Sequence, residues 1–339
     1  MSDTPLVSIV TSCFNHEKFL DDYMAGLLSQ TYPRLELILV DDGSSDGSWE
    51  KIKSYETKLR NKFERLICER HENRGLIPEL GFALKRATGE FFCITSSDDV
   101  YLPHMVEACV SYLLAHPDRG AVHGDTDYVY EDRVEESHWK SIRRRIPEGF
   151  IYEDLIEDNF IMITSACFRA QLVRRFVDFN TYASRNYLLE DYAMCLDLAK
   201  HTPFGYINRS LARYRVLPQS MSHTGGPEKI FRYWKSCFQI KLDSLAQGGA
   251  PETLRAKIES HFYKGLYRTG YALGLKEDCW RGYRWLAQRY PEEFKTRWHF
   301  PRALSTFHRV LWRFVKNIQE MQVIYKTRQW FLELVKERV

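Results

Sequence analysis

The sequence predicts an α/β protein whose central sheet is mostly parallel and flanked by helices, with a helical extension at its C-terminal end. Two observations lead to this fold class. Between residues 6 and 115, short apolar runs rich in β-branched residues alternate with segments of helical periodicity, which is typical of βαβ units. From residue 228 onward the pattern is helical throughout. A chain of 339 residues is long enough for both parts.

The elements follow from the spacing of the apolar residues. Apolar runs such as LVSIVTSC and FFCIT predict buried strands, because they are short and rich in β-branched or aromatic residues. In the segment that follows the first run, Phe19, Leu20, Tyr23 and Leu27 recur at helical spacing, and Pro33 ends the pattern. The expected strands are 6–13, 35–40, 66–69 and 91–95, and the expected helices include 76–87, 105–115, 188–199 and a segment that starts at 48.

Polar clusters follow each of the expected strands. They are Asn15 with Glu17, Asp41 with Asp42, Asn73 with Arg74, and Asp98 with Asp99. Parallel sheets bind ligands at the carboxyl ends of their strands, so this placement predicts a site there. Asp42 is interpreted as a ligand contact and Asp46 as a cap of the next helix. The chain has no GxxxxGK[ST] and no GxGxxG after the first strand, which argues against a P-loop NTPase or a dinucleotide-binding fold.

The net charge, the cysteines and the lengths of the apolar runs indicate which partners and which cellular compartment to expect. The net charge of +3 is too small to argue for a nucleic-acid partner. The eight cysteines show no CxxC and no zinc spacing, so free thiols in a reducing cytoplasm are expected. No signal-peptide pattern opens the chain, and no apolar run reaches the ~18 residues of a membrane span. We expect a cytoplasmic protein, with attachment to the inner face of the membrane left open.

Several motifs in order give a more specific identification. PLVSIVTSCFNHEKFL, SQTYPRLELILVDDGSSD, ENRG and GEFFCITSSDDVYLP together resemble the N-terminal half of a family 2 glycosyltransferase with the GT-A fold. The resemblance covers about residues 5–225, which gives an expected GT-A domain at 1–225 and a helical region at 226–339. It implies an inverting transfer of sugar from a nucleotide-diphosphate sugar, with UDP favoured, to a hydroxyl of a glycan or glycolipid. Bacterial surface polysaccharide or glycolipid synthesis is the implied setting.

The resemblance also implies a set of nucleotide contacts. Asp42 matches the acid that binds the base, and Arg74 lies in the matching Asn-x-Gly segment, next to the base or the diphosphate. Thr11, Asn15 and Glu17 match the first strand end and the polar loop that follows it.

The family's metal motif is commonly DSDD before a proline. Aligned on Pro103, its four positions are Ser96, Ser97, Asp98 and Asp99, so Asp98 is the implied ligand of Mn²⁺ or Mg²⁺ and Ser97 and Asp99 support nucleotide-sugar binding. A hard cation with oxygen ligands can join a carboxylate to a diphosphate. Ser96 departs from the common acid. The alternative is a pair of acids solvated on a surface loop.

A second acidic motif lies in YLLEDYAMCLDLAK. Glu190 and Asp191 match the family's Glu-Asp pair, in which the Asp is the general base that deprotonates the acceptor hydroxyl. The structural alternative is an acid at a helix N-terminus that interacts with the helix dipole, and both roles can hold at once.

The segment LARYRVLPQSMSHTGG resembles the family's later loop over the diphosphate. Arg215 is its candidate diphosphate contact, because guanidinium pairs well with phosphate oxygens. His223 is a weaker candidate for a metal or phosphate contact, and Leu217 stands where the family has a histidine. Asp125 is a candidate acceptor contact, with a strand-end turn acid as the alternative. Tyr214, Ser220 and Ser222 also match the loop.

The end of the chain is basic and amphipathic. Residues 300–339 carry eight Lys and Arg against three Glu, with apolar residues at helical spacing. Such a helix can lie on an anionic membrane surface, pack on its own domain or join a second subunit.

Two competing functions remain open at this stage. A non-catalytic GT-A-fold binding or partner subunit is favoured by Ser96 and Leu217 and opposed by Asp98 and the Glu190-Asp191 pair. A nucleotidyltransferase would need a Gly-rich basic loop near the N-terminus, and SCFNHEKF does not resemble one.

Overall fold

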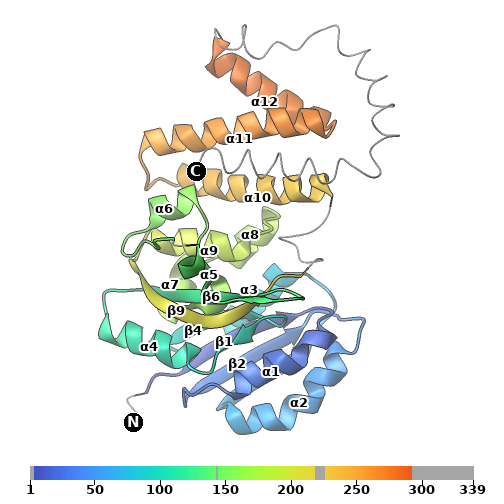
Figure 1. Ribbon diagram of the computed structural model, residues 1–339, viewed down its shortest axis with the longest axis vertical. Helices are drawn as coiled ribbons and strands as arrows, with labels where there is room; N and C mark the ends of the chain where they lie inside the picture. Colours follow the sequence, from blue (N-terminus) through green and yellow to red (C-terminus); the bar gives the residue numbers. More distant parts are fainter. Residues whose placement is uncertain (1–3, 143, 218–225, 292–339) are drawn as a thin grey trace.

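A computed structural model describes residues 4–142, 144–217 and 226–291 of the chain. Within these residues the strands form one mixed sheet in the order β3-β2-β1-β4-β8-β6-β9-β5, and β7 pairs with β6 beside this path. Helices cover both faces of the sheet, and the C-terminal helices stack at the end of the molecule farthest from α1 and α2 (Figure 1). The α/β class with a mostly parallel first half and a helical C-terminal region is therefore confirmed.

The first half of the sheet is parallel. β1 (Val7–Cys13) pairs in parallel with β2 (Leu35–Asp41) and β4 (Phe91–Ser96), and β3 (Arg65–Arg70) pairs in parallel with β2. Successive side chains of a strand point to opposite faces, so each of these apolar strands contributes to two cores. On β2, Ile38 belongs to one core and Leu37 to the other. Burial on both faces explains why β1, β2 and β4 are largely apolar, whereas β3, at the edge of the sheet, is only partly buried.

The helices separate onto the two faces by their buried residues. One core contains side chains of α1 (Leu20–Leu28), α2 (Ser48–Lys62) and α4 (Met105–Ala115). The other contains side chains of α3 (Leu76–Arg86), α8 (Phe179–Ser184) and α9 (Glu190–Ala199). The remaining short elements are η1 (Glu17–Phe19), α5 (His138–Ser141), α6 (Tyr152–Glu157), η2 (Ile163–Ser165) and α7 (Ala170–Phe176).

The second half of the sheet is mixed. β8 (Ala166–Arg169) is antiparallel to both β4 and β6 (Ala121–Val129), and β9 (Phe204–Arg215) is parallel to β6. The short strands β5 (Val100–Tyr101) and β7 (Val134–Glu135) pair antiparallel with β9 and β6.

Two local expectations need correction. Tyr214 and Arg215, expected in a loop, lie at the end of β9, where Tyr214 is in register with Tyr128. They are strand residues because β6 supplies a hydrogen-bonding partner that the local sequence does not reveal. The helix expected at 188–199 begins at Glu190, since the backbone of Leu189 (φ −135°, ψ 73°) is not helical.

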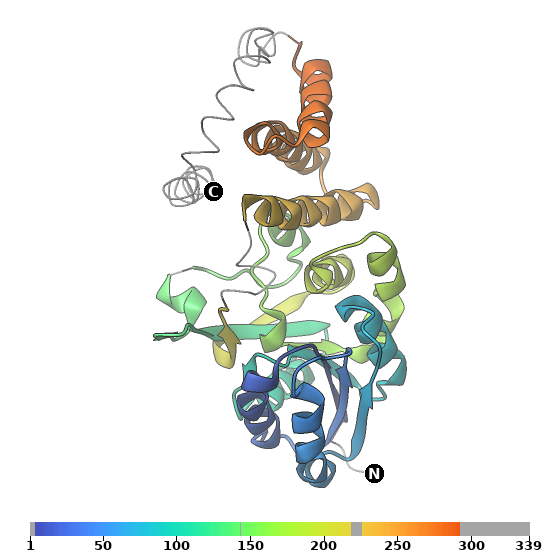
Figure 2. The ribbon, with the colours of Figure 1, turned by 90° about the vertical axis from the view of Figure 1, so that its right-hand side faces the viewer.

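The C-terminal helices are α10 (Pro227–Ala246), α11 (Glu252–Ala272) and α12 (Lys276–Arg289). Figure 2 shows them stacked beyond the sheet, with α10 nearest to it. Ile240 and Leu245 of α10 belong to the same core as α9, whereas Phe231, Phe262 and Leu266 form a small cluster of their own. α10 is thus packed directly on the helix that carries the Glu-Asp pair.

Among the described residues, none of the helices combines the length and apolarity that a membrane crossing requires. All eight cysteines lie in the described ranges and are free. The basic stretch at 300–339 lies outside these ranges, so its membrane, packing and partner interpretations stay predictions.

Candidate active site

The predicted polar clusters meet at one edge of the sheet. Cys13 of β1 is in register with Asp41 of β2, Asp41 with Arg70 of β3, and Ser12 with Ser96 of β4. The loops that follow these strands therefore lie side by side at their carboxyl ends. This arrangement brings together the loops that contain Asn15, Asp42, Arg74 and Asp98.

The acidic turn after β4 presents one carboxylate to this edge. The side chain of Asp98 is 16% exposed, and its Oδ1 accepts a hydrogen bond from the hydroxyl of Ser96. Its Oδ2 lies 4.0 Å from Nε2 of His16, whose Nδ1 is 2.8 Å from the hydroxyl of Ser97. Ser96, which replaces the common acid, thus orients Asp98 instead of adding a second charge.

Asp99 differs from Asp98 in its surroundings. It is buried, and its Oδ1 accepts a hydrogen bond of 2.9 Å from the backbone amide of Arg215. Burial and the nearby charge of Asp98 raise the pKa of Asp99 well above its usual range. Asp99 therefore fixes the end of β9 to the acidic turn.

Arg215 binds the acidic turn through its side chain. Its Nε donates to the carbonyl of Asp98 (3.0 Å), its Nη2 donates to Asp22 (2.9 Å), and its guanidinium lies over the ring of Phe19 at 4.9 Å. A planar guanidinium is suited to several contacts at once. Arg215 lies beside the acidic turn, where the predicted diphosphate contact requires it.

Asp42 organises the loop that contains Arg74. Its two carboxylate oxygens accept hydrogen bonds from the amides of Arg74 (2.7 Å) and Gly75 (2.9 Å). Gly75 has φ 89° and ψ 161°, a region that only glycine adopts readily. The guanidinium of Arg74 donates to Glu79 (2.8 Å), which is buried. The roles of Asp42 and Arg74 toward a nucleotide stay predictions.

The remaining nucleotide candidates join the loops after β1 and β2. Oδ1 of Asn15 accepts from the amide of Ser45 (2.8 Å), and Oε2 of Glu17 accepts from the amide of Gly47 (3.0 Å). Thr11 is buried within β1, where its hydroxyl accepts a hydrogen bond of 2.5 Å from Tyr23. These contacts define the shape of the edge.

The residue next to Gly47, Asp46, accepts the amide of Ser48 at the start of α2 (3.0 Å). The expected interaction of Asp46 with that helix is therefore present, although Gly47 is the cap residue.

The Glu-Asp pair opens α9. Oδ1 of Asp191 accepts a hydrogen bond of 2.7 Å from the amide of Tyr192. Burial raises the pKa of Asp191, and burial together with the charge of Asp191 raises the pKa of Glu190. A carboxylate with a raised pKa is a stronger proton acceptor, which suits a general base.

The other two candidates are placed differently. Asp125 is fully buried and accepts hydrogen bonds from the amides of Trp139 (3.0 Å) and Lys140 (3.2 Å) in α5. This geometry favours the turn-acid interpretation, and an acceptor contact of Asp125 stays a prediction. His223 lies outside the described residues, as do Ser220 and Ser222.

The residues at the edge fit a cation that is shared with a substrate. Among the described residues, no three His, Cys, Asp or Glu side chains are grouped so that they could hold a metal ion by themselves. Mg²⁺ is usually bound by one or two carboxylates together with substrate phosphates, rather than by an all-protein cage. Asp98, partly exposed and oriented by Ser96, fits this donor set.

Two residues at the edge escaped the sequence-based prediction. His16 contacts both Ser97 and Asp98, and Asp22 binds Arg215. His16 stands between Asn15 and Glu17, so its place in a predicted ligand loop was an available signal. Asp22 belongs to a helix pattern and gave none.

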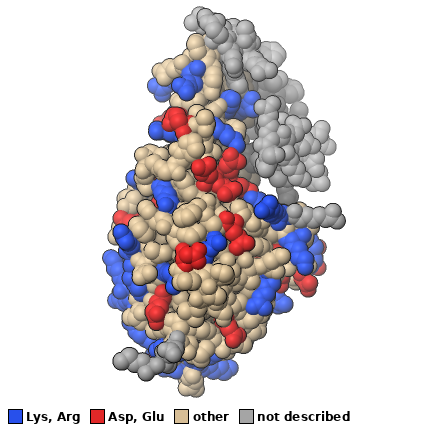
Figure 3. Space-filling model, turned by 90° about the vertical axis from the view of Figure 1, so that its left-hand side faces the viewer, with Lys and Arg blue, Asp and Glu red and all other residues tan. Residues whose placement is uncertain are grey.

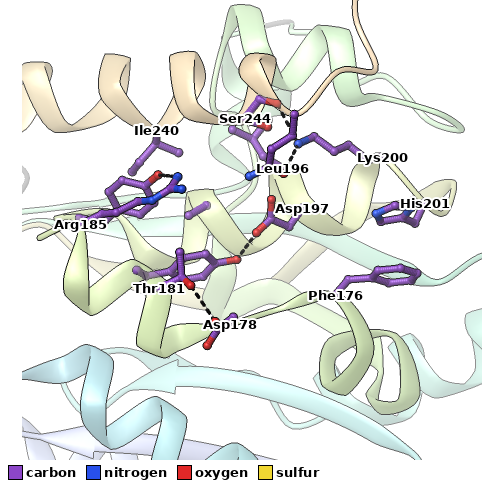
Figure 4. Close-up of a pocket in the computed structure, with 14 residues that line it drawn as sticks. Phe176, Asp178, Thr181, Arg185, Leu196, Asp197, Lys200, His201, Ile240 and Ser244 are labelled. Atoms are coloured by element: carbon purple, nitrogen blue, oxygen red, sulfur yellow. Dashed lines mark hydrogen bonds between the residues drawn. The ribbon is translucent and has the colours of Figure 1, made fainter.

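Within the described residues, α9 contributes to the walls of a larger and a smaller cavity. The larger one, of about 580 Å³, is a groove lined by residues of α3, α10, α11 and α12 and by the segment 183–190, and Glu190 is one of its walls. The smaller one, of about 220 Å³, lies between α9 and α10 (Figure 4). In it, Tyr182 donates to Asp197 (2.5 Å) and Lys200 donates to the carbonyl of Ser244 (2.9 Å). Because these polar groups bind one another, the smaller cavity is interpreted as part of a packing interface.

Comparison with known proteins agrees with this geometry. The model of the family described as glycosyl transferase family 2 matches residues 8–178. The chain is 28% identical over 221 residues to TuaG of Bacillus subtilis (strain 168), a candidate glycosyltransferase of teichuronic acid biosynthesis, covering 64% of this chain and 82% of TuaG. It is 31% identical over 116 residues to EpsE of the same organism, a candidate glycosyltransferase, covering 34% of this chain and 41% of EpsE.

Solved structures show the same fold. The chain matches S. aureus TarS in complex with UDP-GlcNAc with a TM-score of 0.59 at 17% identity, covering 84% of this chain and 80% of that one. It matches the mannosyltransferase PcManGT of Pyrobaculum calidifontis, in complex with GDP-Man and Mn²⁺, with a TM-score of 0.57 at 18% identity, covering 99% and 88%. The GT-A fold is therefore confirmed.

Proposed function

This chain belongs to glycosyl transferase family 2, and from that premise we propose that it moves a sugar from a nucleotide diphosphate to a hydroxyl group of a glycan or glycolipid. The chain is a glycosyltransferase with relatives in bacterial polysaccharide synthesis. The proposal concerns the donor, the metal and the mechanism. UDP is the favoured nucleotide, and TarS and PcManGT support a nucleotide-sugar donor because both were solved with one.

One observation carries the proposal. Asp98 places a partly exposed carboxylate at the edge where the loops after the parallel strands meet, and Ser96, His16 and Arg215 hold the turn around it. Asp98, with His16 beside it, would hold Mn²⁺ or Mg²⁺ together with the donor diphosphate. The cation would stabilise the negative charge on the departing nucleoside diphosphate.

Side chains of the protein would supply the general base and a diphosphate contact. Asp191 takes the proton of the acceptor hydroxyl as its oxygen attacks the anomeric carbon of the donor. A bond forms between that carbon and the acceptor oxygen, while the bond to the diphosphate oxygen breaks and its electron pair leaves with the nucleotide. Displacement from the opposite side inverts the anomeric centre. Arg215, beside the acidic turn, would contact the diphosphate.

A thermal-shift screen tests this proposal. UDP-, GDP- and dTDP-sugars are added with and without Mn²⁺ to the wild type and to Asp98→Asn. A ligand that binds the native state raises the unfolding temperature, so at least one nucleotide sugar should do so more strongly with Mn²⁺.

The matched control is Asp118→Asn, since Asp118 is an exposed acid that pairs with its neighbour Arg119. This control should behave as the wild type, and Asp98→Asn should lose the Mn²⁺-dependent part. If no nucleotide sugar shifts the wild type, or if Asp98→Asn responds as the control does, the proposed donor site is refuted.

A further inference from the structure

The groove beside Glu190 is cationic. Five basic side chains line it against two acidic ones. Basic and acidic side chains are interspersed on the face drawn in Figure 3, whereas the groove concentrates one sign. Its basic residues are Arg74, Arg185, Arg232, Lys235 and Arg281, and its acids are Glu190 and Asp278.

Three of these cations are already neutralised by nearby acids. Arg74 pairs with Glu79 at 2.7 Å, Arg185 with Asp243 at 3.1 Å, and Lys235 with Asp278 at 2.7 Å. Each of these ion pairs reduces the positive charge that a ligand in the groove would encounter. The remaining excess of positive charge must therefore come from the other two basic residues.

Arg232 and Arg281 supply that excess. Within the part of the chain that the structure describes, neither has an acidic partner, and both are exposed. Arg232 comes from α10, and Arg281 from α12, where its guanidinium lies 5.5 Å from the ring of Phe262. One exposed arginine is an ordinary solvated side chain, but two from separate helices line the same groove beside the catalytic pair.

The groove meets the edge of the sheet that carries the nucleotide-sugar candidates, the donor edge, at Arg74 and Gly75. Asp42, Asp98 and Asp99 do not line it, whereas Glu190, the neighbour of the proposed base, does. A volume of about 580 Å³ is within the ~300–1,000 Å³ that is typical of small-molecule sites. Its walls also include the apolar side chains of Leu76 and Leu188, against which a sugar ring can pack.

From these observations we propose that the groove binds the acceptor, and that the acceptor is an anionic glycan carrying phosphate or carboxylate groups. A guanidinium binds both groups through paired hydrogen bonds, so Arg232 and Arg281 fit either source of charge. They also offset the negative charge of the Glu190-Asp191 pair, which would otherwise repel an anionic acceptor from the base. The inference rests on the proposed transferase function and adds the class of its acceptor.

A binding assay with three labelled probes tests the inference. Tetragalacturonate carries carboxylates, a glycerol phosphate tetramer carries phosphodiesters, and maltotetraose is neutral. Fluorescence polarisation with the full chain should show that at least one anionic probe binds about tenfold more tightly than maltotetraose. Raising NaCl from about 50 to about 300 mM should weaken that binding, because exposed charges are screened. The two anionic probes tell phosphate from carboxylate as the preferred group.

Substitutions of Arg232 and Arg281 test whether these two residues bind the anionic probe. Arg232→Gln with Arg281→Gln should weaken the anionic probe about tenfold. Arg284→Gln is the matched control, because Arg284 is an exposed residue of α12 that does not line the groove, and it should stay within about twofold.

The inference is overturned if the double variant binds the anionic probe as the wild type does, if the neutral probe binds equally well, or if the wild type binds no probe. The nucleotide-sugar thermal shift is measured in parallel and reports on the donor site alone. Failure of the transferase proposal would appear there, whereas failure of the acceptor inference would leave that shift intact.

Discussion

Replacing Asp191 by asparagine tests the proposed base most directly. The substitution is almost isosteric, and the side-chain oxygen of asparagine can still accept the hydrogen bond from the amide of Tyr192. The amide cannot take up a proton at neutral pH, however. General base catalysis contributes about 10²–10⁴-fold, so we expect turnover to fall by that factor.

The same substitution should stabilise the fold. Burial raises the pKa of Asp191, and burial with the charge of Asp191 raises that of Glu190, so the ionised forms are disfavoured in the native state. A raised native pKa gives stability that is complete below the unfolded pKa and is lost as the pH rises through the native pKa. For Glu190, whose native pKa is about 8, part of this stability is therefore still present at neutral pH, and the rest is lost as the pH rises further. Removing the buried carboxylate of Asp191 should therefore raise the free energy of unfolding at neutral pH.

Two measurements check both parts. Turnover is followed as nucleoside diphosphate released from the nucleotide sugar that stabilises the wild type most. Unfolding is followed by urea titration between about pH 5 and pH 8, where the advantage of the variant should grow with pH.

The control is Asp197→Asn on the same helix. Asp197 is also largely buried, and burial raises its pKa, but it accepts a hydrogen bond from Tyr182 in the smaller cavity. It should change stability and leave turnover within about twofold.

Two results would refute the reasoning. Turnover of Asp191→Asn within about threefold of the wild type would exclude Asp191 as the base. If Asp191→Asn is less stable than the wild type at every pH, the buried ionised carboxylates do not destabilise the native state.

Three shorter predictions concern the donor edge. Asp98→Asn should weaken Mn²⁺-dependent binding of the nucleotide sugar about tenfold or more in calorimetry, and unchanged affinity would exclude Asp98 as the ligand. Arg215→Lys keeps the charge but cannot bind both the carbonyl of Asp98 and Asp22 in the same geometry, so the free energy of unfolding should fall by about 1 kcal/mol and the donor KM should rise; a KM equal to that of the wild type would exclude the diphosphate role. Gly75→Ala places a side chain at φ 89° and ψ 161°, so a loss of about 1–3 kcal/mol is expected in urea unfolding, and a neutral result would contradict this backbone geometry.

The parallel half of the fold could be predicted from the sequence because β1, β2 and β4 are largely apolar runs. The expected strand at 35–40 and the expected helix at 105–115 agree closely with β2 and α4. In the second, mixed half of the sheet, the strands have weaker sequence patterns. β8 has four residues, and β9 has the sequence FGYINRSLARYR, which neither alternates strictly nor is continuously apolar. Its conformation depends on pairing with β6, which is distant in the chain.

The candidate site shows the same division. Asp98 and Asp191 could be proposed from the sequence because each stands in a short motif at the end of a strand or the start of a helix. The partners that hold them could not all be found, since His16 and Asp22 reach the acidic turn only through the fold. The role of Ser96 was also hidden, because its hydrogen bond to Asp98 depends on the shape of the turn.

The extent of the family match suggests how donor and acceptor functions divide along the chain. The match ends at residue 178, and it includes Asp42 and Asp98 but not α9 or the helices that follow. Four of the five basic residues of the groove lie beyond that point, as does the proposed base Asp191. A nucleotide sugar presents the same diphosphate whatever the acceptor, so the loops that would bind it can serve many enzymes. The acceptor changes from one enzyme to another, and the residues that would select it here come from α10 and α12. On this argument, exchanging Arg232 and Arg281 should alter acceptor choice without altering donor choice, and a variant that changed both would show that the groove and the donor edge act as one site.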